Sequence, residues 1–336
     1  MDALATRTAG LARLASFVPG AGPAYARTRN YDHGPRRRSN VSGLSPWIRL
    51  RLLTEQEVLA AAVAAHGPSG CRKFAEEVCW RTYFKGWLEL RPAVWSDSRA
   101  ELKRQRDALS RPGARHDAWR RALAGETGID CFDAWVRELA ETGYLHNHAR
   151  MWFASIWIFT LDLPWQLGAD LFLRHLLDGD PASNTLSWRW VAGLHTRGKT
   201  YLARRDNIRK YTGGRFDPGD RLSRVAPAVD EPPPPPPAAL PPTPSLPGSR
   251  PLALLLTEDD LQPESLGLPA ERIAAVGGFS AAAERAVDGT ADGPVDFARG
   301  GLEDALARAA DDFGAETRLV APTALDHIAT WLEDDG

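Results

Sequence analysis

The sequence predicts a mainly α-helical protein that ends in a small α/β-like module, and three observations lead to this fold class. Apolar residues recur at helical spacing through the first two thirds of the chain, where strand-like alternation is scarce. A proline-rich segment over residues 226–251, with an unbroken run at Pro232–Pro237, then interrupts the chain. Short apolar runs alternate with a helical pattern after it. We therefore expect a helical domain over residues 1–225, an extended linker over 226–251 and an α/β-like module over 252–336.

The first domain is expected to hold about ten or more helices, judged from its periodicity. One helix face is formed by four apolar residues at i, i+3, i+4 and i+7, namely Phe132, Trp135, Val136 and Leu139. A more deeply buried helix is expected over Leu145–Leu161, ending near Pro164, because proline cannot continue a helix.

The module after the linker is expected to alternate strands with helices. Leu252–Leu256 and Ile273–Val276 are short apolar runs, and Arg318–Ala321 is a candidate third strand. Gly301–Asp312 has the pattern of an amphipathic helix, and Ala324–Leu332 that of a last helix.

Charge divides the chain in the same place as the linker. Residues 1–225 carry 35 basic and 23 acidic side chains, whereas residues 226–336 carry 6 and 20. The basic part suits a polyanion such as nucleic acid, although the two parts could also simply complement each other. No apolar run is long enough to cross a membrane, and three cysteines without CxxC spacing favour a reducing cytoplasm.

Three segments combine residue types that could carry chemistry. On a helix, Glu77, Trp80 and Arg81 share one face with Phe84, which otherwise reads as an ordinary amphipathic face. The other two segments are Tyr144–Met151, YLHNHARM, and Asp178–Trp190, DGDPASNTLSWRW. Each of the three segments taken alone is equally compatible with core packing.

Within these segments the spacing argues against a metal site. His146 and His148 stand at i and i+2, so they do not face one point on a helix. Asp180 precedes Pro181 and is expected to cap a helix that has proline at its first position. Asn184 and Trp188 then lie one turn apart on that helix.

Taken in order, the segments resemble the DNA photolyase and cryptochrome family. The resemblance rests on Glu77…Trp80-Arg81, on Tyr144-x-His146-Asn147-x-x-Arg150-Met151 and on Asp178-Gly-Asp180-x-x-x-Asn184-x-x-x-Trp188. Ser42-Gly-Leu44-Ser45-Pro46 and Thr127-Gly128, followed by Asp133 and Arg137, match two further family patterns. The likeness covers roughly residues 25–215 and implies an all-helical FAD-binding domain.

What the resemblance implies is a blue-light flavoprotein. FAD would be held by Ser42, Leu44, Arg81, Asn147, Arg150, Asp178, Asp180 and Asn184, with Asn184 facing flavin N5. The substrate would be a pyrimidine dimer in DNA, flipped into a pocket lined by Glu77, Trp80, Asn147, Met151 and Trp190. The catalytic set would be Glu77 and Asn184 together with Trp188 and Trp165, the inner and middle members of a tryptophan chain whose outer member has no match; Trp119 is out of register.

The sequence also departs from this family. The usual N-terminal α/β domain, which holds a light-harvesting pigment, is expected to be missing. The acidic module is a candidate to replace part of it or to bind a protein partner. Two other functions stay open: a cryptochrome-like photoreceptor that signals through a partner, and a non-photochemical FAD protein. The basic segment after Trp190 could contact phosphates or be a solvated surface.

Overall fold

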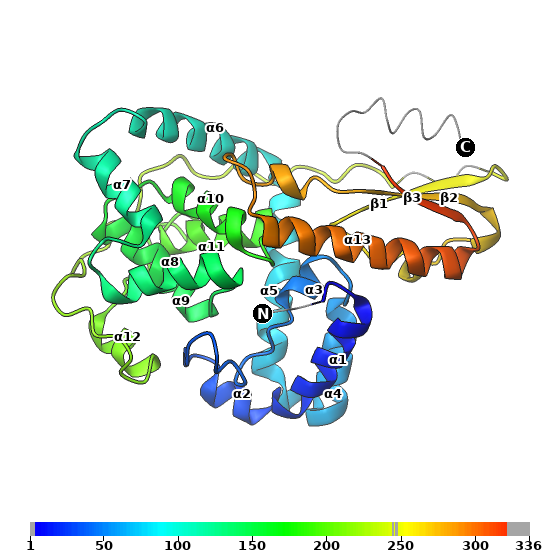
Figure 1. Cartoon of the computed structure of the whole chain (residues 1–336), viewed down its shortest axis with the longest axis horizontal. Helices are drawn as coiled ribbons and strands as arrows, with labels where there is room; N and C mark the ends of the chain where they lie inside the picture. The colour runs from blue at the N-terminus through cyan, green and yellow to red at the C-terminus, as the bar shows by residue number, and fades with distance from the viewer. Residues whose placement is uncertain (1–3, 244, 246–247, 321–336) are drawn as a thin grey trace.

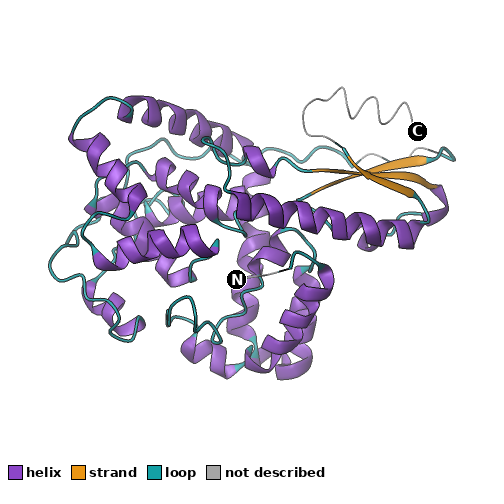
Figure 2. Cartoon of the chain, in the orientation of Figure 1, coloured by secondary structure: helices purple, strands orange, loops and turns teal. Residues whose placement is uncertain are grey.

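The computed structural model describes residues 4–243, 245 and 248–320 of the chain. Helices make up most of the molecule, and a three-stranded sheet lies at one end, as Figure 2 shows. The predicted fold class, mainly helical with a small α/β-like module, is confirmed. Across these described residues no helix is long and apolar enough to cross a membrane.

The first group of helices packs around α5 near the centre of the molecule (Figure 1). It comprises α1 (Arg7–Phe17), α2 (Pro23–Thr28), α3 (Ser45–Arg49), α4 (Glu55–Gly70) and α5 (Arg72–Glu89). Helix α4 begins with a reciprocal cap, in which Thr54 accepts from the Glu57 N–H and the Glu57 carboxylate accepts from the Thr54 N–H.

The second group forms the larger helical body. It comprises α6 (Pro92–Leu109), α7 (Ala114–Ala124), α8 (Asp130–Thr142), α9 (Asn147–Ser155), α10 (Trp165–His175), α11 (Pro181–Val191) and α12 (Arg205–Tyr211). Its core contains five fully or almost fully buried indoles, Trp135, Trp152, Trp157, Trp165 and Trp188. The predicted apolar face of α8 is confirmed, since all four of its residues are buried in this core.

The helix expected over Leu145–Leu161 is shorter in the structure. It begins at Asn147 because the His146 side chain caps it by accepting from the His148 N–H at 3.2 Å. Its last turn, Ile156–Thr160, is π-helical, and the Leu161 N–H bonds to the Ile156 carbonyl. The spacing of apolar residues does not distinguish this wider turn from an α-helical one.

The module after the linker contains a parallel sheet of order β1-β2-β3, with β1 (Leu252–Thr257), β2 (Ile273–Phe279) and β3 (Glu316–Leu319). Helix α13 (Asp292–Phe313) connects β2 to β3 and begins nine residues before the expected Gly301. Short helical turns complete the description: η1 (Val18–Gly20), η3 (Pro263–Leu266), η4 (Ala270–Arg272) and η5 (Ala282–Glu284). The last expected helix, Ala324–Leu332, lies outside the described residues.

The module packs directly on the first group of helices. Side chains of α13 and of the sheet share one apolar core with residues of α1, α3 and α4, including Leu14, Trp47 and Val58. At Gly301 a side chain would lie 2.9 Å from Leu50, so this close approach of the helix requires glycine. The proline-rich segment follows the helical body, where the Val229 N–H bonds to the Ala192 carbonyl.

Candidate functional site

The turn between α10 and α11 carries two buried carboxylates, Asp178 and Asp180. Asp180 caps α11, because its Oδ1 accepts from the Ser183 N–H at 2.6 Å, and Pro181 is the first residue of the helix. The predicted cap is therefore confirmed. This cap fixes the backbone of the turn, so that Asp178 is directed away from α11 toward α9.

Two arginines from other helices face this turn. Arg150, on α9, donates from Nη2 to Asp178 Oδ2 at 2.9 Å. Arg81, on α5, acts on both carboxylates through its charge. Burial acts to raise the pKa of Asp178, but Arg150 and Arg81 outweigh it, and the pKa lies below its usual value. For Asp180, Arg81 and Arg49 likewise outweigh burial and lower the pKa.

Two buried polar atoms at this place, Asp178 Oδ1 and Arg81 Nη1, lack a partner within the described part of the chain. Buried polar atoms are normally hydrogen-bonded, so unpaired donors and acceptors that converge here fit a polar ligand. A ligand with both donor and acceptor edges, such as a flavin ring, matches this set of atoms.

Asn184 lies one turn along α11 from this cluster and is buried. Its Nδ2 donates to the Ala169 carbonyl of α10 at 2.8 Å. This bond holds the amide in one orientation and leaves Oδ1 as an acceptor.

The turn is braced from behind by two arginines that the sequence reasoning did not single out. The buried guanidinium of Arg285, from the module, donates to three main-chain carbonyls at 2.8–3.0 Å, those of Leu173, Leu176 and Gly179. Arg49, at the end of α3, donates to the Gly179 carbonyl at 3.2 Å. Burial and the nearby Arg49 charge lower the pKa of Arg285 to about 10, so it stays charged at neutral pH.

In contrast, the neighbouring face is open to solvent. Trp80 and Trp190 have 50% and 37% of their surface exposed, although aromatic side chains are usually buried. Asn147 is exposed and Met151 is half-buried on α9. The Glu77 carboxylate accepts from the Arg29 guanidinium, a partner that sequence reasoning missed.

His195 joins the two helices that carry this face. Its ring contacts three aromatic residues of α5, with centroids 5.1–6.0 Å away, namely Tyr83, Phe84 and Trp87. His195 thus ties the segment after α11 to the aromatic side chains of α5, whereas the ring of Trp190 packs against Tyr201, with centroids 5.7 Å apart.

The remaining predicted residues lie around the cluster. Leu44 is fully buried at the start of α3, and its N–H bonds to Ser42 Oγ at 3.4 Å. The next residue, Ser45, contributes to the low pKa of Asp178, so this segment adjoins the turn. Trp188 and Trp165 are both buried, on α11 and α10, which pack together.

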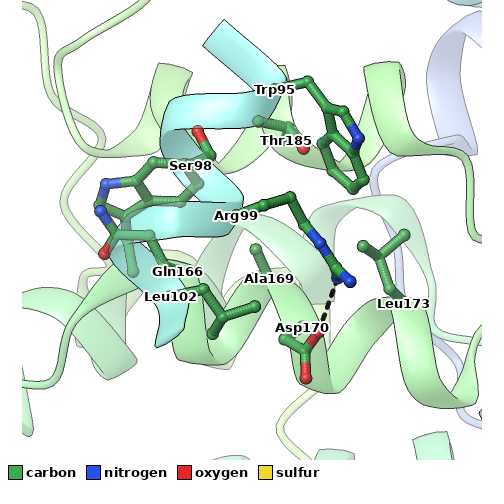
Figure 3. A pocket seen from close by; sticks show the side chains of 10 residues that line it. Trp95, Ser98, Arg99, Leu102, Gln166, Ala169, Asp170, Leu173 and Thr185 are labelled. Carbon is green, nitrogen blue, oxygen red and sulfur yellow. Dashed lines mark ion pairs between the residues drawn. The ribbon is translucent and has the colours of Figure 1, made fainter. Parts of the chain in front are cut away.

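A small cavity lies between α6, α10 and α11, and Figure 3 shows the residues around it. Arg99 and Asp170 form an ion pair across it at 3.6 Å, and Trp95 and Trp165 contribute to its lining. Its volume of about 20 Å³ admits little more than one water molecule, so it is no cofactor site.

Comparison with known proteins shows what the helical part is similar to. Residues 74–224 match the family described as the FAD binding domain of DNA photolyase. The deoxyribodipyrimidine photo-lyase of Streptomyces griseus is 37% identical over 189 residues, covering 50% of this chain and 38% of that protein. One from Thermus thermophilus is 35% identical over 228 residues, covering 65% of this chain and 50% of that protein. The chain thus spans half or less of the length of these relatives.

Among solved structures, a bacterial class III photolyase from Agrobacterium tumefaciens matches with a TM-score of 0.52 and 28% identity, covering 62% of this chain and 43% of that one. The matched family region contains α5, α9 and the turn before α11, and it ends before the acidic module. Residues 74–224 of the helical part are therefore similar to the FAD binding domain of DNA photolyase.

Proposed function

We propose that this protein is a photolyase-type flavoenzyme, which uses blue light to split pyrimidine dimers in DNA. One observation carries the proposal: a buried cluster of paired charges with unpaired polar atoms lies beside an exposed aromatic face. The cluster suits a polar, ring-shaped cofactor, and the face suits an extruded base.

The residues that would hold FAD are those of the cluster. Arg150 and Asp178 would bond to the edge of the flavin ring, and the Arg81 guanidinium suits a phosphate oxygen. When bound, the reduced, light-excited flavin supplies the electron that opens the dimer. The free Oδ1 of Asn184 is an acceptor, which favours a protonated ring nitrogen and hence a reduced flavin.

The exposed face would receive the dimer. Trp80 and Trp190 would stack on the extruded bases, and such stacking contributes roughly 1–3 kcal/mol per base. Glu77 would accept a hydrogen bond from a base edge once its ion pair with Arg29 opens. Asn147 and Met151 border the same face from α9.

The basic character of residues 1–225 would provide affinity for the phosphates of DNA. That affinity should fall steeply as salt is added, because each neutralised phosphate releases a counterion. Trp188 and Trp165 would return electrons to an oxidised flavin through the packed pair α10 and α11.

The test uses the purified full-length protein with FAD and an oligonucleotide that carries one thymine dimer. We expect dimers to disappear under blue light and to persist in the dark. Glu77→Gln should slow repair by at least tenfold without loss of FAD, since Glu77 would contact the substrate and pairs with Arg29, not with the residues that would hold FAD. Gln replacing Glu57, a carboxylate of the α4 cap, serves as the matched control.

A protein that holds FAD and responds to light, yet leaves dimers intact, would instead be a cryptochrome-like photoreceptor. A protein that holds FAD without any light response would be a non-photochemical flavoprotein. Either result would overturn the proposed repair activity.

A further inference from the structure

We propose that Glu231 is the proton acceptor of Trp165, so that the tryptophan chain ends at Trp165 as a neutral radical. This inference rests on the proposed function, because the flavin is the source of the oxidising charge. It concerns a residue of the proline-rich segment that lies beyond the family region, residues 74–224.

The geometry of the Glu231 carboxylate carries the proposal. Its Oε1 accepts from the Trp165 indole N–H at 2.7 Å and from Gln166 Nε2 at 3.0 Å. Its Oε2 accepts from Arg189 Nη1 at 2.9 Å. Gln166 of α10 and Arg189 of α11 therefore hold the carboxylate against the Trp165 indole nitrogen. The distance between the two groups suits proton transfer.

Trp188 is the informative contrast. Its indole nitrogen is also buried, but it has no hydrogen-bond partner among the residues described. Oxidised Trp188 therefore has no adjacent base and remains a cation. Of the two proposed chain members, Trp165 is the one with a carboxylate on its N–H.

The Arg189 charge acts against a resting cation on Trp165, whereas the Glu231 carboxylate, 2.7 Å from the indole nitrogen, attracts the proton that such a cation loses. The Arg189 guanidinium lies 5.7 Å from the centre of the Trp165 ring. A positive charge on this buried ring would be repelled by Arg189, and the surroundings screen it poorly. Loss of the indole proton removes that repulsion and lets the oxidised state persist.

Once Trp188 has lost one electron to the light-excited cofactor, Trp165 would pass one electron to the Trp188 cation, which would become neutral again. The Trp165 Nε1–H bond breaks with its electron pair left on nitrogen, and the proton forms an O–H bond with Glu231. The products are a neutral Trp165 radical and a Glu231 carboxylic acid. Return of an electron to Trp165 draws the proton back.

Glu231 is also placed to exchange its proton with water. About a quarter of its side chain is exposed, at 24%, whereas Trp165 is 2% exposed. The buried indole thus reaches solvent through the carboxylate. With this arrangement the tryptophan chain can end at Trp165, without an outer tryptophan.

The experiment compares wild type with Glu231→Gln, which keeps an acceptor for Trp165 but cannot take its proton. Glu57→Gln is the matched control, since Glu57 also pairs with an arginine but lies at the cap of α4. FAD content and thermal unfolding are measured first for each protein. Laser-flash absorption of the oxidised-flavin form then identifies the tryptophan radical and its protonation state.

We expect a long-lived neutral radical in wild type and in Glu57→Gln, formed more slowly in D₂O. In Glu231→Gln we expect a cation radical that decays about tenfold faster, because its charge-stabilising proton transfer is lost. Trp165→Phe should abolish the long-lived radical, and Trp95→Phe should leave it unchanged.

Three results would overturn the inference. One is an unchanged neutral radical and isotope effect in Glu231→Gln. The second is loss of the long-lived radical in Trp95→Phe, which would carry the chain on across the cavity of Figure 3. The third is no tryptophan radical in a wild-type protein that holds FAD. A wild type without FAD would refute the proposed function itself.

Discussion

The two walls of the candidate site differ in how the fold holds them. The wall formed by Asp178 and Asp180 is buried, paired with arginines and braced from behind by Arg285 of the module. The second wall is the neighbouring face with Trp80 and Trp190, which is exposed and contributes little to the core. Both walls are built from helices of the same domain, so the difference lies in what covers them.

This contrast separates two roles. Side chains of the buried wall hold their geometry through packing and long-range bonds, which suits the positioning of a cofactor. Side chains of the exposed wall keep their apolar surfaces in water and gain contacts only when a partner arrives. Substitutions should therefore cost stability on the first wall and affinity on the second.

The largest effect is expected from Arg285→Ala. Three carbonyls of the turn each lose a charged donor, although the Gly179 carbonyl keeps Arg49 and the Leu176 carbonyl keeps a main-chain N–H. Since a hydrogen bond to a charged group contributes about 1.5–3 kcal/mol, we expect a loss of about 3–5 kcal/mol. Urea unfolding monitored by tryptophan fluorescence measures it. Arg299→Ala, an exposed change in the same module, should stay within about 0.5 kcal/mol. Equal effects of the two substitutions would show that the module does not brace the turn.

A smaller loss, about 2–3 kcal/mol, is expected from Asp178→Asn. The change leaves Arg150 and Arg81 facing each other across a neutral group, but Arg150 is partly exposed, which limits the penalty. The control is Asp259→Asn, since Asp259 is largely exposed in its pair with Arg49. We also expect Asp178→Asn to be purified with less FAD; full FAD occupancy would contradict the assigned role.

Acid should lower the free energy of unfolding through His146, which caps α9. Burial lowers the pKa of His146 to about 4, whereas an unfolded histidine titrates near 6.5. Below pH 6.5 the unfolded chain binds a proton that the folded chain refuses, so stability falls as the pH falls, by about 2 kcal/mol at pH 5. His146→Asn keeps a capping side chain and should flatten this part of the profile. If the stability of His146→Asn falls with pH as steeply as that of the wild type, a group other than His146 causes the loss.

The smallest change in stability is expected on the exposed wall. Trp80→Ala and Trp190→Ala should shift the free energy of unfolding by less than about 1 kcal/mol. Their affinity for dimer-containing DNA should fall by about five- to 150-fold, the range for losing one stacked base. Fluorescence anisotropy measures the binding. If either tryptophan variant lost much stability but kept its affinity for DNA, the exposed wall would have a structural role and not a binding role.

The sequence was informative where structure depends on nearby residues. The Asp180 cap and the buried face of α8 follow from spacings within one or two turns, and both are confirmed. The π-helical end of α9 was missed, because the same apolar residues suit either kind of turn. The catalytic and binding roles assigned to Glu77, Asn184 and the tryptophans stay predictions.

The braces of the site could not be read from the sequence. Arg285 is 106 residues from Gly179, and Glu231 is 66 residues from Trp165, so each meets its partner only through the tertiary fold. Neither stands in a recognisable motif. Their buried hydrogen bonds are what reveals them.

The central claim, that the cluster of Arg81, Arg150, Asp178 and Asp180 holds a flavin, has a direct test. The purified protein is stripped of cofactor, titrated with FAD and followed by its visible absorption in the dark and under blue light with a reductant. The account predicts saturation at one FAD per chain, bleaching in the light, and at least tenfold weaker binding in Asp178→Asn. Equal binding by the variant, or no saturable binding by the wild type, would contradict it.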